Sequence, residues 1–367
     1  MKSVRRLPVL VLLAALLAPS RVAAQAQNPA AEKPSASLVV LPVIYYTPET
    51  RLAFGAGGIY TFRPKGTPST GRPSYLQAIV VYTQNKQFSL SLEPNLYLRN
   101  ETLLVNCLVE LKKYPNKFWG IGSDTLDTAE ENYTPAQQSF NISLQKRVSR
   151  REFLFVGMKY TFEHYKFLKF DAEGQLASGH IAGSPGGILS GLGLVFSLDS
   201  RDNIFSSSSG NYFQVTAQAF NRILASDYNY LSFKADLRRF IPLWRSHVLA
   251  LQCILQALPG ETPFLALAPL GGDSLMRGYY TGRYRDKVLL AGQAEYRLPL
   301  WWRFGLVAFA GAGGVANRLA CLSAAALKLA YGLGFRFKLN REGANLRLDF
   351  AQGKGTSGVY FTAGEAF

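Results

Sequence analysis

The strongest constraint on this chain is a two-residue alternation of polar and apolar side chains that recurs along almost its whole length. In segment 87–98 one face is apolar and carries Phe88, Leu90, Leu92, Leu96 and Leu98. Segments 230–238, 287–298 and 345–350 repeat the pattern. Successive side chains of a β-strand point to opposite faces of the sheet. Each segment therefore predicts a strand with one polar and one apolar face.

Sixteen such segments fill residues 37–367, with boundaries good to a few residues. They are 37–46, 51–63, 73–83, 87–98, 101–113, 136–148, 152–165, 187–198, 211–223, 227–239, 246–258, 287–298, 303–314, 327–338, 343–352 and 356–367. An even number returns the last strand to the side where the first begins. The long connections 114–135, 168–186 and 259–286 then share one end, and the tight turns 149–151, 299–302 and 340–343 share the other.

Soluble sandwiches also alternate, but three features favour a membrane barrel. The apolar face continues from strand to strand with no convincing helix to cover it, and loop lengths alternate between short and long. All four tryptophans lie at strand ends or turns, where an interfacial aromatic girdle belongs: Trp119, Trp244, Trp301 and Trp302. Because backbone groups in lipid must all be paired, the sheet has to close. We therefore expect an all-β, transmembrane antiparallel β-barrel of sixteen strands.

The N-terminus predicts export. Lys2, Arg5 and Arg6 precede a short apolar stretch at 7–18, and small residues end at Ala24. This is the pattern of a secretory signal peptide, and the stretch is too short for a membrane-spanning helix. We expect residues 1–24 to be removed, 25–36 to form a short periplasmic tail, and 37–367 to form a multi-pass barrel in the outer membrane of a Gram-negative cell.

The net charge indicates which partners this chain could bind, and the cysteine content indicates whether disulfides or a metal site are expected. The chain has 40 basic and 24 acidic residues, a net charge of +16, and removing the four basic groups of residues 1–24 leaves about +12. For an exported chain, anionic lipopolysaccharide or phospholipid is a simpler partner than nucleic acid. Cys107, Cys253 and Cys321 are scattered and odd in number, so neither a disulfide framework nor a metal site is expected. We find no phosphate-binding loop and expect no cofactor.

Several motifs in the second half resemble one family. Loop 271–279 contains Arg277, Gly278 and Tyr279 after the eleventh strand, which is similar to the Arg-Gly-Phe/Tyr loop of the BamA/TamA outer-membrane family, also called the bacterial surface antigen family. The turn after strand eight resembles the family's periplasmic turn through Asp199, Arg201, Asp202 and Gly210. Segment 292–299 looks like its twelfth strand, and Phe367 like its C-terminal end. The likeness is strongest over 191–367.

The resemblance implies that the long loop folds into the lumen. The alternation of side chains along segment 287–298 predicts a partner for Arg277 there. Glu295 shares the polar face of Lys287, Gln293 and Arg297. We expect Arg277 to pair with Glu295, Gly278 to let the backbone approach the wall, and Tyr279 to pack over the pair. The family often has Asp where this chain has Gly311, so Glu295 should be the main partner. The alternative is a solvated Arg277 in a mobile loop.

Two further expectations concern the chain ends. Family barrels use a terminal aromatic as a signal for insertion by the barrel assembly machinery, so Phe367 should serve assembly more than stability; the alternative is one more girdle aromatic. Pro42 in the first strand and Gly358 and Gly364 in the last predict weak pairing where these strands meet. That seam could open toward lipid, or it could be a bulged but permanently closed join.

The sequence leaves the activity open. The leading hypothesis is assembly or translocation of outer-membrane protein or lipid with a separate periplasmic partner, since the periplasmic repeat domains of assembling members are not seen here. A passive pore is a second possibility, suited by polar lumen residues such as Asn141, Ser143, Gln145 and Gln293.

An enzyme is a third possibility, and we expect no catalytic residues. Segment 272–275 spells a lipase/esterase signature around Ser274, but His164, His180 and His247 all precede that serine. That family has its Asp-x-x-His near the end of the domain, and this chain has no such motif. No motif in the sequence indicates a barrel phospholipase.

Overall fold

The computed structural model describes residues 36–47, 50–65, 71–149, 153–339, 343 and 345–367. The expected signal peptide and nearly all of the expected tail lie outside these residues. The described residues form nineteen strands and five short 3-10 helices. None of the helices in this part of the chain has the length and apolar character needed to cross a membrane.

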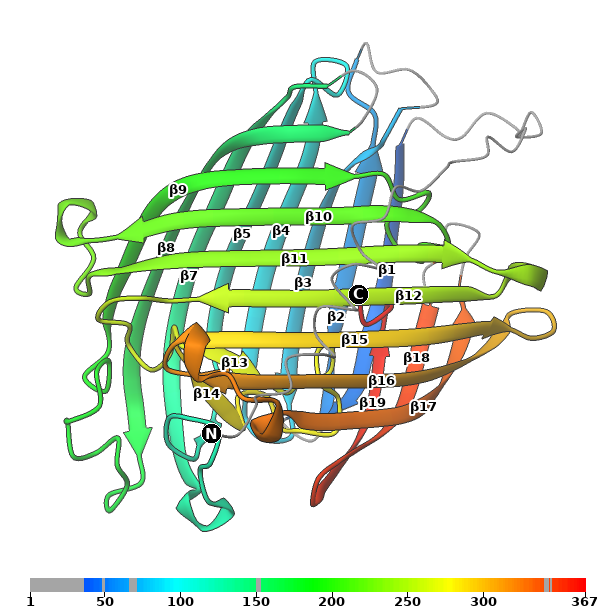
Figure 1. Cartoon of the computed structure of the whole chain (residues 1–367). Coiled ribbons are helices and arrows are strands. Elements are labelled where there is room, and N and C mark those ends of the chain that lie inside the picture. Colours follow the sequence, from blue (N-terminus) through cyan, green and yellow to red (C-terminus); the bar gives the residue numbers. More distant parts are fainter. Residues whose placement is uncertain (1–35, 48–49, 66–70, 150–152, 340–342, 344) are drawn as a thin grey trace.

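One antiparallel sheet contains seventeen strands, and sixteen of them close into a ring (Figure 1); the other, β6 (Asn116–Phe118), pairs only with β7. Each strand pairs with the next along the chain, and β1 pairs with both β2 and β19, so the ring has no free edge. The strands of this wall are β1 (Ala36–Thr47), β2 (Arg51–Phe62), β3 (Ser74–Thr83), β4 (Phe88–Leu98), β5 (Leu103–Lys113), β7 (Glu131–Arg147), β8 (Leu154–Phe170), β9 (Gly187–Asp199), β10 (Gly210–Phe220), β11 (Tyr230–Pro242), β12 (Val248–Ala257), β15 (Val288–Pro299), β16 (Phe304–Ala316), β17 (Lys328–Lys338), β18 (Asn345–Gly353) and β19 (Thr356–Ala363).

All sixteen predicted segments correspond to wall strands, but three boundaries were wrong. β7 and β8 extend beyond the predicted loop boundaries, because their ends pair with each other past a register shift at Thr134 and Pro135. The last strand ends at Ala363 and not at residue 367. Three short strands were not predicted: β6 (Asn116–Phe118), β13 (Ala268–Leu270) and β14 (Tyr284–Asp286).

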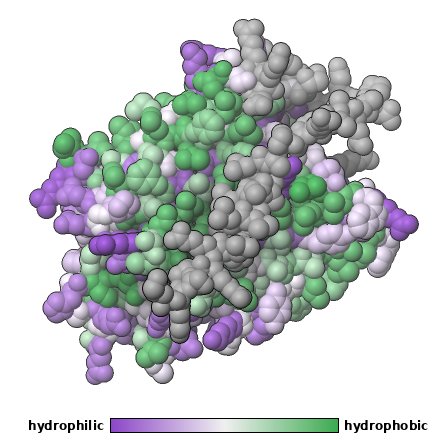
Figure 2. Space-filling model, viewed as in Figure 1, coloured by the Kyte–Doolittle hydropathy of each residue, from purple (hydrophilic) through white to green (hydrophobic). Residues whose placement is uncertain are grey.

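In strand after strand of the wall, side chains alternate between the outer surface and the lumen, as the sequence pattern predicts. Outward residues such as Leu194, Leu329 and Leu333 are more than 60% exposed, at 63%, 63% and 64%. Figure 2 shows hydrophobic side chains over much of the strand surface and hydrophilic ones concentrated toward its ends. A closed sheet with an exposed apolar outer face requires an apolar surrounding, which is the interior of a lipid bilayer.

The two ends of the barrel differ. The connections 114–130, 171–186 and 258–287 share one end, here the loop end, while both ends of the described chain and the connections 243–247 and 300–303 lie at the other, here the turn end. Residues 258–287, the lumen loop, fold back inside the wall and include the β13–β14 pair. Their buried core residues Leu270, Met276 and Tyr279 pack in one cluster with wall residues.

One tryptophan contradicts the expected girdle. Trp119 is 5% exposed, and its ring centroid lies 5.3 Å from that of Tyr280 in the lumen loop. The guanidinium of Arg283 lies 5.2 Å from the same ring. Trp119 therefore packs connection 114–130 onto the lumen loop, and only Trp244, Trp301 and Trp302 remain on the outer surface.

Candidate functional site

The side chain of Arg277 is completely buried between the lumen loop and the wall. Its Nη2 lies 2.5 Å from Oε1 of Glu295 on β15, and its Nη1 lies 2.5 Å from Oδ2 of Asp349 on β18. The structure therefore brings Arg277 and Glu295 together. It also corrects the expectation of one main partner, because Asp349 supplies the second carboxylate from a different strand than the one that holds Gly311.

Local backbone geometry explains how Arg277 reaches the wall. Gly278 has φ +105°, and a Cβ there would lie 2.9 Å from the backbone of Gln352 and Gly353 on β18. Its N–H donates to the hydroxyl of Tyr360 at 3.0 Å. Only a residue without a side chain fits this approach, since both the space and the positive φ exclude a Cβ. Glycine at 278 thus fixes the depth at which Arg277 enters.

The pair belongs to a larger arginine–carboxylate hub, formed by Arg277, Glu295, Arg297, Arg336, Arg347, Asp349 and Glu365. Arg297 binds Glu295 at 2.9 Å, and Arg336 binds Asp349 at 2.6 Å and Glu365 at 2.8 Å. Arg347 lies 3.7 Å from Asp349 and donates to Thr362 at 2.9 Å. The hub joins the lumen loop to β15, β17, β18 and the segment after β19.

The hub is shielded from water. The guanidinium carbon of Arg277 lies 3.6 Å from the ring centroid of Phe309 on β16. The expectation that Tyr279 covers the pair was wrong, because its hydroxyl instead donates to the carbonyl of Leu329 at 3.0 Å and its ring packs against Gly353. Buried charges are costly unless they are paired, so breaking one pair should leave an uncompensated charge.

Phe367 does not end a strand. It turns into the lumen at the turn end, is 8% exposed, and packs with Phe240, Val248 and Ala250. Its carbonyl oxygen accepts a hydrogen bond from Nη2 of Arg297 at 3.1 Å. Burial raises the pKa of nearby Glu365, but Arg297 and Arg336 outweigh burial and hold that pKa below its ordinary value. The last residues thereby anchor to the hub.

The turn after β9 holds the second predicted group. Arg201 binds Asp199 through two hydrogen bonds of 2.9 and 3.0 Å, and Arg72 lies 3.0 Å from the same carboxylate. Asp202 accepts from the backbone N–H groups of Ser208 and Ser209. Gly210 has φ +98°, and a Cβ there would lie 2.2 Å from the carbonyl oxygen of Ser200. These contacts give the turn a fixed shape.

The join between the first and last strands is short. Among the described residues, β1 and β19 share a single pair of Cα partners, Tyr46 and Phe361, whereas β1 and β2 share twelve. Pro42 lies within β1, and Gly364 follows the end of β19 with φ +89°. We call this join the seam.

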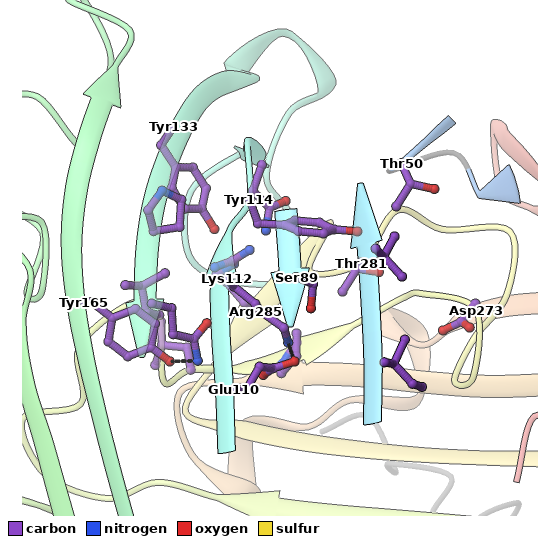
Figure 3. A pocket seen from close by; sticks show the side chains of 18 of the residues that line it. Thr50, Ser89, Glu110, Lys112, Tyr114, Tyr133, Tyr165, Asp273, Thr281 and Arg285 are labelled. Carbon is purple, nitrogen blue, oxygen red and sulfur yellow. Dashed lines mark hydrogen bonds and ion pairs between the residues drawn. The ribbon is translucent and has the colours of Figure 1, made fainter. Parts of the chain in front are cut away.

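A cavity of about 650 Å³ lies in the lumen beside the seam (Figure 3). Apolar side chains from β1 and β3 and from the lumen loop line one part of it, including Val43, Ile79 and Leu265. Glu110 and Lys112 of β5 line another part and form a 2.7 Å ion pair.

Connection 114–130 packs on the lumen loop at the loop end. The N–H of Gly122 donates to the carbonyl of Arg285 at 2.9 Å. Arg283 binds Asp127 at 2.6 Å and Thr125 at 2.7 Å. Contacts between two long connections therefore cover the lumen at this end.

The other possible functions leave little trace in the geometry. Ser274 Oγ donates to Asp273 at 3.1 Å, and within the described residues none of the three histidines is bonded to it. His247 lies at the turn end, where its Nδ1 is 2.7 Å from the hydroxyl of Tyr296. Asn141, Ser143, Gln145 and Gln293 face the lumen, but Gln293 donates to the carbonyl of Ser274 at 2.7 Å and so also holds the lumen loop.

Comparison with known proteins identifies the fold. The sequence model described as the Omp85 superfamily domain matches residues 70–367. No curated protein matches the chain in sequence. Among solved structures, BamA from Haemophilus ducreyi lacking POTRA domains 1–3 superposes with a TM-score of 0.60 at 13% identity, over 90% of this chain and 70% of that one.

Two structures of CdiB are also similar. CdiB from Acinetobacter baumannii has a TM-score of 0.58 at 12% identity, over 91% of this chain and 60% of that one. CdiB from Escherichia coli has a TM-score of 0.57 at 11% identity, over 92% of this chain and 63% of that one. This chain thus spans less than two thirds of the CdiB chains. At these identities the likeness concerns the fold.

Proposed function

The chain belongs to the Omp85 superfamily, and from that premise we propose that it inserts or translocates outer-membrane protein or lipid together with a separate periplasmic partner. The observation that carries the proposal is a contrast within one barrel. The hub holds the lumen loop to three wall strands, β15, β17 and β18, and to the segment after β19, while the described residues of the seam share one pair of Cα partners. A rigid lumen beside a weak join suits an opening between strands rather than a through-channel.

The contacts that cover the lumen at the loop end argue against a passive pore. The contacts of Arg283 with Asp127 and of Gly122 with Arg285 lie across the path that a solute would take through the lumen. We infer low single-channel conductance in planar bilayers. A steady open channel of the size found in general porins would support the pore instead.

The partner is expected at the turn end, which we assign to the periplasm. The ordered turn at 200–209, with Asp199, Arg201 and Asp202 setting its shape, offers a fixed polar surface there.

Outer-membrane lipid and lipopolysaccharide surround the wall. The barrel assembly machinery would insert the barrel into the membrane, with Phe367 as a recognition element. No cofactor, metal or nucleic acid has a place in this activity.

Reconstitution tests the proposal. The full chain in proteoliposomes should raise the folding rate of a urea-unfolded eight-stranded outer-membrane barrel above that in empty liposomes, measured by protease protection. A control with an equal amount of a general porin removes the effect of simple bilayer perturbation. An equal rate with the chain and with the porin would contradict an assembly role, and lipid transfer between labelled vesicles would then test the remaining branch.

A further inference from the structure

The three outer tryptophans gather on one sector of the turn end. Trp244 lies in the β11–β12 turn, and Trp301 and Trp302 lie in the β15–β16 turn. They are 66%, 70% and 76% exposed. Because β12 pairs with β15, the two turns lie side by side, and both project at the same end of the barrel in Figure 1. No other exposed tryptophan occurs in the part of the chain that the structure describes.

These aromatic side chains are held by neighbours. The ring centroids of Trp302 and Phe337 are 5.8 Å apart, and Phe304 lies 5.3 Å from Phe337. Trp301 packs 5.6 Å from Phe304. In the adjacent turn, Trp244 lies 5.6 Å from the ring of His247. These ring contacts hold the three tryptophans in fixed positions.

Exposed basic residues accompany the aromatic ones. Arg245 follows Trp244, Arg303 follows Trp302, and Lys338 ends the neighbouring strand β17. The guanidinium of Arg303 lies 5.5 Å from the ring of Trp302 and donates to the carbonyl of Leu339 at 3.3 Å. Among the described residues of 243–247, 300–303 and 337–339 there is no acidic side chain. The sector is thus positively charged as well as aromatic.

We propose that this basic–aromatic sector, formed by Trp244, Arg245, Trp301, Trp302, Arg303 and Lys338, binds anionic phospholipid headgroups of the leaflet at the turn end. Tryptophan rings favour the headgroup level, because one part of the indole is apolar and its N–H is polar. Lysine and arginine beside them attract phosphate at the same depth. The combination selects an anionic headgroup over a zwitterionic one, which aromatic residues alone would not do.

Tryptophan quenching by brominated lipids measures the selection directly. The full chain is reconstituted in liposomes that contain equal mole fractions of brominated phosphatidylglycerol or brominated phosphatidylcholine. We expect stronger quenching by the brominated anionic lipid, by at least about twofold in local enrichment, and a decrease of that difference as salt is raised. Trp119 provides an unquenched background, because it is buried in the lumen.

Two matched triple variants separate a local site from overall charge. Arg245→Gln, Arg303→Gln and Lys338→Gln together should abolish the difference between the two lipids. Lys65→Gln, Arg99→Gln and Lys146→Gln remove three exposed basic groups elsewhere at the same end and should preserve it. Equal quenching of the unmodified chain by both lipids would overturn the proposal and leave an ordinary aromatic girdle. An equal effect of both triple variants would also overturn it, in favour of net charge.

Discussion

Arg277 and Asp349 form a 2.5 Å ion pair although 72 residues separate them in the chain. The same guanidinium binds Glu295, so one side chain of the lumen loop joins two strands that are not neighbours in the wall. A fully buried cation between two buried carboxylates is stable only when all the pairs are made. The hub therefore acts as a single unit that fixes the loop in the lumen.

Removing one charged side chain from the hub should lower the free energy of unfolding. We predict that Arg277→Ala, Glu295→Gln and Asp349→Asn each lower stability by about 3–5 kcal/mol, because each leaves a buried charge unpaired. Double-mutant cycles of Arg277→Ala with each acid should be strongly non-additive, read out by unfolding in detergent. Asp127→Asn serves as the control, since Asp127 is 92% exposed in its pair with Arg283 and should cost about 0–1 kcal/mol. Additive effects in both cycles would show that the hub does not act as a unit.

Glu365 gives the hub a pH dependence. Its pKa in the folded barrel lies below the ordinary value of 4.5, so its ionised form stabilises the fold at neutral pH. That stabilisation is lost as the pH falls from about 4.5 through the lower folded-state pKa. We predict that Glu365→Gln lowers the melting temperature at pH 7 and that the gap to the unmodified chain closes toward pH 3. A gap that stays constant across this range would mean that folding does not shift the pKa of this carboxyl group.

Phe367 has two roles to separate. Its side chain is buried beside Phe240, with ring centroids 6.3 Å apart, so Phe367→Ala should lower refolded stability by about 3–5 kcal/mol. Phe240→Ala removes the other half of the same contact and leaves the C-terminal residue intact. If Phe367 is also an insertion signal, its variant should lose much more outer-membrane yield than Phe240→Ala at similar stability. Equal yields from the two variants would reduce Phe367 to a packing residue.

Strand number and facing were predictable because the alternation is a local property. One face of every wall strand must suit lipid, so the hydrophobic pattern fixes which side chains of a strand such as β15 point outward. The alternation also placed Glu295 on the lumen side, and over 345–350 it puts Asp349 on the polar face of its strand. The pairing of Asp349 with Arg277 was missed, since nothing local to β18 reports which loop residue will reach it.

The errors share a physical origin in contacts between distant segments. Trp119 sits next to a strand end, as a girdle residue would, but its partner Tyr280 is 161 positions later in the chain. The alternation continues to Phe367 and so predicts a last strand that reaches that residue. In the structure Gly364 adopts a positive φ and the chain turns inward to Arg297. Lumen packing overrides the strand pattern wherever it offers a better-buried environment.

The proposed assembly role requires β1 and β19 to separate at the seam, and a reversible crosslink tests this requirement most directly. Tyr46→Cys and Phe361→Cys place two thiols on the Cα partners that the described part of the seam shares, in a chain whose three native cysteines are replaced by serine. Phe54→Cys with Tyr82→Cys forms the control, because these are Cα partners on β2 and β3 and also face outward. We predict that oxidising the seam pair abolishes the accelerated folding of the unfolded barrel substrate in proteoliposomes, that reduction restores it, and that the β2–β3 crosslink has no effect. Full activity with the seam oxidised would contradict the account.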